Sequence, residues 1–221
     1  MNAGPLHSGQ RVLSTGASLN EARLAAVMIH GRGASAEDIL TLAQDIQAYG
    51  AEEGRRSDIC YLAPQAAGNT WYPLPFTAPL EQNEPWLSSA LGIIGSLFEQ
   101  LEKAGIPSER TLLLGFSQGA CLALEWAARN PRRFAGLVGL SGGLIGPNDT
   151  PRDYPGSLGG TPVFLGCSDI DPHIPKERVL ETAAVLKRMG GEVETRLYPN
   201  MGHFVNQDEI LYVRSLLQNS P

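Results

Sequence analysis

The stretch from residue 112 to residue 124 constrains the fold of this chain more than any other. Residues 112–114 are three consecutive leucines, which is typical of a strand buried on both faces, and the small and apolar residues after Gly119 favour a buried helix. Between them, residues 115–119 read Gly-Phe-Ser-Gln-Gly and fit the G-x-S-x-G pattern of a nucleophile elbow. Glycine fits the crowded flanking positions of such a tight turn, which lifts the serine oxygen above the sheet edge. The pattern predicts Ser117 as a nucleophile.

Apolar runs alternate with helical patterns along the rest of the chain. We expect an edge strand near residues 11–15 and further strands at 24–29, 59–62, 135–140, 162–166 and 193–198. Apolar residues at helical spacing predict helices within 36–46, 87–101, 120–129, 179–189 and 210–217. Such alternation predicts an α/β fold: a mostly parallel sheet with helices on both faces and no large cap domain.

Length and charge narrow the class of protein. The 221 residues suit a single domain spanning 1–221, and the net charge of −6 argues against binding nucleic acid or a membrane surface. The apolar run at 24–29 is too short to insert into a membrane or to act as a secretory signal, so we expect a cytoplasmic protein. The odd number of cysteines, Cys60, Cys121 and Cys167, with no C-x-x-C pair, predicts buried reduced thiols.

Candidate partners for the serine fall at the ends of other predicted strands. In open α/β sheets, ligands bind at the carboxyl ends of the strands, so these side chains are expected to meet there. His203 is the predicted general base, because an imidazole with a pKa of about 6.5 can take and return the serine proton. Asp169 and Asp171 both qualify as the acid that orients His203, and spacing alone does not decide between them.

Two backbone amides are expected to stabilise a developing oxyanion. One belongs to Gln118 at the start of the helix, and the other to Arg32 in the turn at residues 30–33. The Arg32 side chain either faces solvent or steers an anionic substrate. His30 is expected to support the turn from below.

Two other histidines, His7 and His173, are less suited to act on the serine. His7 is expected to lie in an N-terminal tail, and His173 to lie too near the acid loop to face the serine as well. The sequence therefore assigns neither of them a role in the reaction.

The segment from residue 63 to 85 carries five prolines and no periodicity. A long irregular segment inside a compact domain is usually functional, so we interpret it as a pocket wall or lid, with a packed surface loop as the alternative. Trp71, Tyr72 and Phe76 are its candidate pocket residues, and Leu144 of a second loop, at residues 142–160, is expected to join them.

Taken together, these motifs resemble those of the phospholipase/carboxylesterase family of α/β hydrolases. The resemblance covers nearly the whole chain and rests on residues 30–33, 115–119, 171–175 and 202–203, in that order. It implies a serine hydrolase with no metal or cofactor, and a triad of Ser117, Asp171 and His203. It also implies that the Arg32 and Gln118 amides form the oxyanion hole, and it selects Asp171 because the family's aspartate directly precedes a proline.

The chain departs from the acyl-protein thioesterases of that family at three places. Residues 32–34 read Arg-Gly-Ala, residues 167–169 read Cys-Ser-Asp, and the 71–76 segment is unlike a thioesterase acyl channel. We therefore expect the bacterial carboxylesterase branch, acting on small-molecule esters with small to medium acyl groups. The alternatives are a thioesterase or lysophospholipase for long acyl chains and a non-catalytic binding protein; a dienelactone-hydrolase-like role is disfavoured by serine at position 117. A homodimer is possible.

Overall fold

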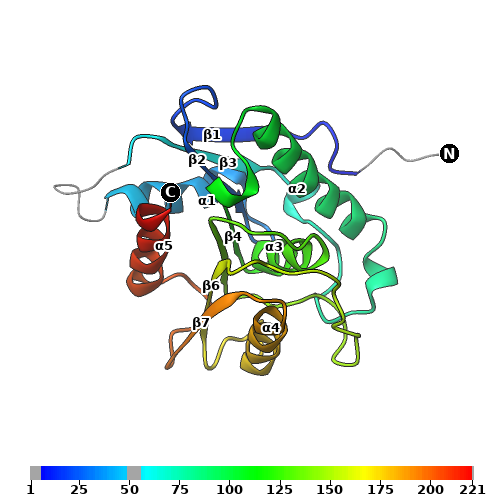
Figure 1. Ribbon diagram of the computed structural model, residues 1–221. Coiled ribbons are helices and arrows are strands. Elements are labelled where there is room, and N and C mark those ends of the chain that lie inside the picture. Colours follow the sequence, from blue (N-terminus) through cyan, green and yellow to red (C-terminus); the bar gives the residue numbers. More distant parts are fainter. Residues whose placement is uncertain (1–5, 49–55, 221) are drawn as a thin grey trace.

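The computed structural model describes residues 6–48 and 56–220. Within them, seven strands form one sheet in the order β1-β3-β2-β4-β5-β6-β7 (Figure 1). Edge strand β1 runs antiparallel to β3, and all the other neighbouring pairs are parallel, as expected from the sequence. The strands are β1 (Val12–Gly16), β2 (Leu24–Ile29), β3 (Ile59–Pro64), β4 (Thr111–Phe116), β5 (Gly136–Leu140), β6 (Pro162–Ser168) and β7 (Glu192–Tyr198). The ends of the predicted domain, 1–221, lie outside the described residues.

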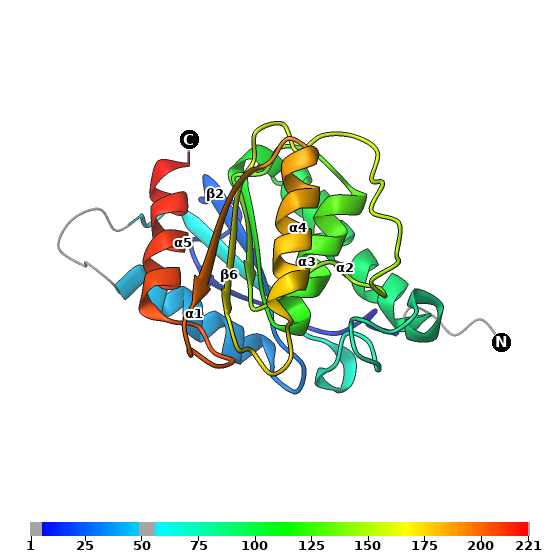
Figure 2. The same ribbon diagram turned by 90° about the horizontal axis from the view of Figure 1, so that it is seen from below.

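Five α-helices cover the two faces of the sheet. Helices α1 (Ala36–Ala48) and α5 (Gln207–Asn219) lie on one face, and α2 (Trp86–Lys103), α3 (Gln118–Arg129) and α4 (Lys176–Arg188) lie on the other (Figure 2). Alternate residues of β4 show why its sequence is apolar throughout. Leu113 packs with the α2, α3 and α4 side, whereas Leu112 and Leu114 pack with α1 and α5.

Local sequence signals set the ends of several helices. Ser35 precedes α1 and exchanges hydrogen bonds with Asp38, whose carboxylate accepts the Ser35 amide at 2.8 Å. Asn206 precedes α5 and forms a full capping box with Glu209. Gly105, which follows α2, has a φ of +83°, a conformation that glycine adopts at little cost.

The elbow between β4 and α3 is a crowded turn. A side-chain carbon on Gly119 would overlap the carbonyl oxygen of Ile29, and one on Gly115 would overlap the carbonyl oxygen of Gly119. Ser117 itself has a φ of +56°, a strained conformation for a residue with a side chain. These close approaches explain why the pattern requires glycine on both sides of the serine.

The three cysteines are buried and form no disulfide, as predicted. None of the helices in the described ranges combines the length and the apolar character needed to span a bilayer.

Candidate active site

Three strand ends bring Ser117, His203 and Asp171 together. Ser117 follows β4, Asp171 follows β6, and His203 lies in the loop after β7. The His203 Nε2 atom lies 2.9 Å from the Ser117 Oγ atom, and His203 Nδ1 lies 2.7 Å from Asp171 Oδ2. An ionised carboxylate can only accept a hydrogen bond, so Nδ1 is the donor and Nε2 is left to accept the serine hydroxyl.

The Asp171 carboxylate is held in its ionised form. Its side chain is fully buried, and Oδ1 accepts the backbone amides of His173 and Ile174 at 2.8 and 3.0 Å. Burial raises the pKa of Asp171, but the hydrogen bonds from His203 and from these two amides outweigh it, so the pKa lies below its usual value. Asp169, the other candidate acid, accepts the amide of Asn200 at 2.8 Å and supports the turn before His203 instead.

The two residues whose amides are expected to form an oxyanion hole line the same cavity as the serine. A side-chain carbon on Gly31 would lie 3.3 Å from the Ser117 Cβ atom, so the turn at residues 30–33 packs directly against the nucleophile. Within the described ranges, no hydrogen-bond acceptor is found for the backbone amide of Arg32 or of Gln118. Both amides are therefore available to donate, and their role in an oxyanion hole stays a prediction.

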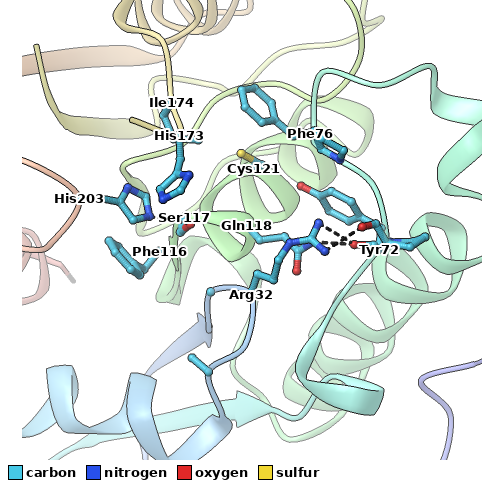
Figure 3. A pocket seen from close by; sticks show the side chains of 14 residues that line it. Arg32, Tyr72, Phe76, Phe116, Ser117, Gln118, Cys121, His173, Ile174 and His203 are labelled. Carbon is cyan, nitrogen blue, oxygen red and sulfur yellow. Dashed lines mark hydrogen bonds between the residues drawn. The ribbon is translucent and has the colours of Figure 1, made fainter. Parts of the chain in front are cut away.

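The side chains of these same two residues clamp one segment of the long irregular loop. The Arg32 guanidinium donates to the carbonyl oxygens of Tyr72, Pro73 and Leu74 at 2.8–3.0 Å. Figure 3 shows the guanidinium beside Tyr72. The Gln118 side chain accepts the amide of Trp71 at 3.0 Å and donates to the Tyr72 carbonyl at 2.8 Å. Arg32 is exposed, in agreement with the first of its two expected roles, and its guanidinium also holds this segment of the loop.

A cavity of about 620 Å³ opens in front of Ser117. Tyr72 and Phe76 line it as predicted, and the irregular loop is one of its walls. The complete lining is Gly31, Arg32, Ala34, Tyr72, Pro73, Pro75, Phe76, Phe116, Ser117, Gln118, Cys121, His173, Ile174 and His203.

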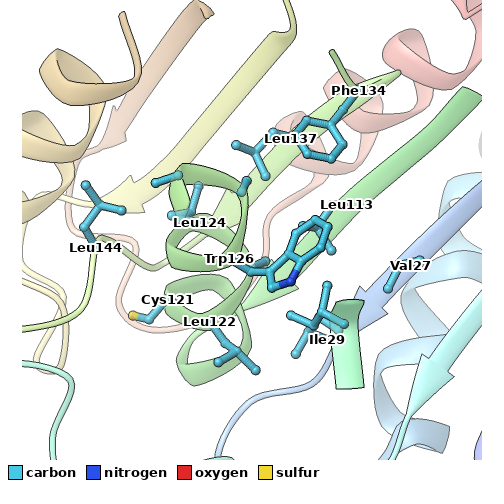
Figure 4. Packing of buried hydrophobic residues seen from close by; sticks show 14 of the residues in the cluster. Val27, Ile29, Leu113, Cys121, Leu122, Leu124, Trp126, Phe134, Leu137 and Leu144 are labelled. Carbon is cyan, nitrogen blue, oxygen red and sulfur yellow. The ribbon is translucent and has the colours of Figure 1, made fainter. Parts of the chain in front are cut away.

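Two predicted pocket residues point into the core instead. Trp71 is fully buried, and its indole N–H donates to the carbonyl oxygen of His30 at 2.9 Å. Leu144 packs in the core cluster that Figure 4 shows, and its carbonyl oxygen accepts from the Arg178 guanidinium of α4. That bond holds the 142–160 loop against α4, and no residue of this loop lines the cavity, so the sequence-based placement of Leu144 is wrong.

The other histidines also differ in part from expectation. His30 is buried beneath the turn as expected, with Nε2 accepting the Ala66 amide at 3.1 Å. His7 does not lie in an exposed tail. It is fully buried, and its ring centroid lies 5.4 Å from that of Trp71. His173 lines the same cavity as Ser117, and its ring centroid lies 4.8 Å from that of His203. Its place two residues after Asp171 brings it to this wall, a position that the sequence analysis did not assign to it.

The cysteines near the site are protonated thiols. Cys121 lines the cavity, and burial raises its pKa to about 12. Cys167 lies 3.7 Å from Asp171 Oδ2, and burial followed by the charge of Asp171 raises its pKa to about 12. Among the described residues, no group of three or more His, Cys, Asp or Glu side chains could hold a metal ion.

The sheet order, the elbow and the serine at its apex define an α/β hydrolase. Residues 14–220 match the family model described as phospholipase/carboxylesterase, and the chain belongs to that family. A solved phospholipase/carboxylesterase from Dyadobacter fermentans is 38% identical, with a TM-score of 0.87 over 95% of this chain and 96% of that one.

Curated relatives are matched over shorter segments. An acyl-protein thioesterase 1 from Gibberella zeae is 32% identical over 132 residues, which are 56% of this chain and 53% of that protein. A probable carboxylesterase SOBER1-like from Arabidopsis thaliana is 26% identical over 145 residues, or 66% of this chain and 55% of that protein. The chain thus spans about half the length of these curated relatives.

Proposed function

We propose that this protein is a serine hydrolase that cleaves carboxylic esters through an acyl-enzyme intermediate. The observation that carries the proposal is the hydrogen-bonded series Ser117–His203–Asp171 at the wall of a mostly apolar cavity. In this proposal Ser117 is the nucleophile, His203 the general base and Asp171 the residue that orients the imidazole and stabilises its charged form. No metal or cofactor takes part.

In the first half of the reaction, His203 Nε2 takes the Ser117 proton while the serine oxygen attacks the ester carbonyl carbon. The amides of Arg32 and Gln118 stabilise the oxyanion; in other enzymes, one such donor is worth about 3 kcal/mol of barrier. Nε2 then gives the proton to the leaving oxygen, and an alcohol departs. In the second half, His203 Nε2 takes a proton from water, and the hydroxide oxygen attacks the acyl carbonyl carbon. The bond from that carbon to Ser117 Oγ then breaks, Nε2 returns its proton to Oγ, and the carboxylic acid is released.

The shape and chemistry of the cavity support a small to medium apolar acyl group. Tyr72, Phe76, Cys121 and Ile174 are among its lining residues, and no carboxylate or lysine of the described ranges lines it. The guanidinium of Arg32 is already bound to three carbonyl oxygens, so it offers no strong site for an anionic acyl chain.

A thioesterase or lysophospholipase acting on longer acyl chains is the second candidate. It is favoured by the acyl-protein thioesterases among the relatives of this chain. A thioester needs the same nucleophile, base and oxyanion donors, so leaving group and chain length are what distinguish the two functions. A non-catalytic binding protein on the same fold is the third candidate, and the assembled triad argues against it.

The proposal is tested by hydrolysis of matched oxygen esters and thioesters with acyl chains of 2 to about 16 carbons. We expect the highest kcat/KM for oxygen esters of short to medium acyl chains, and no turnover by Ser117→Ala. A maximum at long-chain thioesters would favour the second candidate. Tight binding of an ester without turnover by the wild type would favour the third.

Three further properties stay proposals: that residues 1–221 form a single domain, that the protein is cytoplasmic, and that it can form a homodimer.

A further inference from the structure

A second cavity of about 290 Å³ lies beside the first, between α1 and the segment that leads into α5. Gly31, Ala34 and Phe116 line both cavities. The other lining residues are His30, Asp38, Ile39, Thr41, Leu42, Asp45, Val205 and Ile210. We refer to this second cavity as the α1 groove.

The α1 groove is close to the reacting groups. Gly31 is the residue whose added Cβ would lie 3.3 Å from the Ser117 Cβ atom. The Phe116 ring packs against the His203 ring, with centroids 5.0 Å apart. In Figure 3, Phe116 lies on the other side of Ser117 from Cys121 and Phe76. The first cavity extends to residues 72–76, whereas the groove extends to α1 and Ile210, so the two run in different directions from the residues that they share.

We propose that the α1 groove binds the alcohol part of the ester, while the first cavity binds the acyl part. This inference rests on the proposed function. His203 Nε2 must reach the leaving oxygen to protonate it, so the leaving group has to depart on the side where the base stands. His203 lines the first cavity, and Phe116, which packs on the His203 ring and lines both cavities, connects the base with the groove.

The lining of the α1 groove indicates which alcohols fit. Ile39, Leu42, Val205 and Ile210, together with Phe116, provide an apolar wall. The charged groups among its lining residues are the carboxylates of Asp38 and Asp45, because burial lowers the pKa of His30 and keeps that imidazole neutral. A branched apolar alcohol fits this lining, a cationic one is favoured further, and an anionic one is repelled.

The first experiment fills the groove from its solvent side. Thr41 is exposed on α1 and lines the groove, so Thr41→Trp occupies it without disturbing the core. Gln44→Trp is the matched control, because Gln44 is exposed on the same helix and is not part of the groove. The substrates are methyl butyrate, whose alcohol is too small to reach the groove, and 3,3-dimethylbutyl butyrate, whose alcohol is large and branched.

We expect Thr41→Trp to lower kcat/KM for the dimethylbutyl ester on the order of tenfold, and to change that for the methyl ester less than twofold. Gln44→Trp should change neither. Equal losses on both esters, or no loss on the larger one, would overturn the groove assignment while leaving ester hydrolysis itself intact. If the wild type hydrolyses neither ester, the proposed function fails, and this inference fails with it.

The second experiment tests whether the groove prefers an alcohol that carries a positive charge. Butyrylcholine and 3,3-dimethylbutyl butyrate have the same shape, but only the choline ester carries a positive charge. We expect wild type to prefer the choline ester, and Asp45→Asn to reduce that preference about twofold to threefold, since a single exposed carboxylate interacts weakly. Glu37→Gln is the control, because Glu37 lies on the same helix, pairs with Arg11 and is outside the groove. Equal wild-type kcat/KM values for the two esters would refute the charge preference.

Discussion

At the scale of single residues, the two aspartates after β6 have separate tasks although only one residue lies between them. Asp171 is bonded to His203, whereas Asp169 is bonded to the amide of Asn200. We expect Asp171→Asn to lower kcat by a factor on the order of 10³–10⁴, because the amide no longer favours the required imidazole tautomer. Asp169→Asn should cost tenfold at most. Measured kcat values for the pair decide this, and a larger loss in Asp169→Asn would contradict the assignment.

A second residue-scale prediction concerns Glu209, whose carboxylate is buried behind the site. Its Oε2 atom accepts the Asn206 amide at 2.8 Å, and its other oxygen lies against Gly166. Burial raises the pKa of Glu209 to about 7. The unfolded chain releases this proton near pH 4.5 and the folded one near 7, so the free energy of unfolding falls as pH rises between these values.

Glu209→Gln removes that pH dependence. Its stability relative to wild type should therefore rise between pH 5 and pH 8, by at most about 3 kcal/mol. Urea denaturation at pH 5, 6.5 and 8 measures this, with Glu102→Gln on the exposed face of α2 as the control. Asp171 does not interfere, because its lowered pKa places its contribution at more acidic pH. Parallel curves for wild type and Glu209→Gln would refute the prediction.

At the scale of elements, the elbow between β4 and α3 requires the backbone of α3 to approach the backbone of β2 very closely. Gly119→Ala places a methyl group onto the Ile29 carbonyl oxygen of β2, and neither rigid element can move away. We expect a loss of at least about 3 kcal/mol in the free energy of unfolding, or no folded protein. Gly92→Ala in α2 is the control, because nothing lies within 4 Å of its added carbon. That control should stabilise the protein by about 1 kcal/mol, by helix propensity.

The clamp on the irregular loop is the second prediction at this scale. Arg32→Leu keeps the backbone amide but removes the guanidinium that binds the carbonyl oxygens of residues 72–74. We expect amides at residues 71–76 to exchange hydrogen faster and kcat/KM to fall about tenfold, because a cavity wall loosens. Arg11→Leu, which removes an exposed arginine paired with Glu37, should change neither. Unchanged exchange in Arg32→Leu would show that the loop is held by other contacts.

At the scale of the whole molecule, the sequence predicted those features that depend on a local pattern of residues. The elbow, the strand ends and the alternation of strands and helices each depend on neighbouring residues. They predicted the sheet and the pair Ser117 and His203, whereas the choice of Asp171 over Asp169 depended on the family resemblance.

The pocket walls could not be predicted in this way, because distant contacts determine them. Trp71 turns inward because His7, 64 residues earlier, and His30 both bind it. Leu144 turns inward because Arg178 of α4 holds its carbonyl oxygen. No pattern within either loop indicates these partners. Composition therefore suggested that all three aromatic residues line the pocket, although Trp71 belongs to the core.

The central claim, an activated Ser117, is tested most directly by covalent labelling. Wild type and Ser117→Ala are treated with a fluorophosphonate, and intact mass is measured. The account predicts one adduct on wild type, none on Ser117→Ala, and strongly slowed labelling of His203→Ala, because His203 Nε2 is the atom that takes the serine proton. A folded wild-type protein that stays unmodified would contradict it, as would equal labelling of wild type and Ser117→Ala.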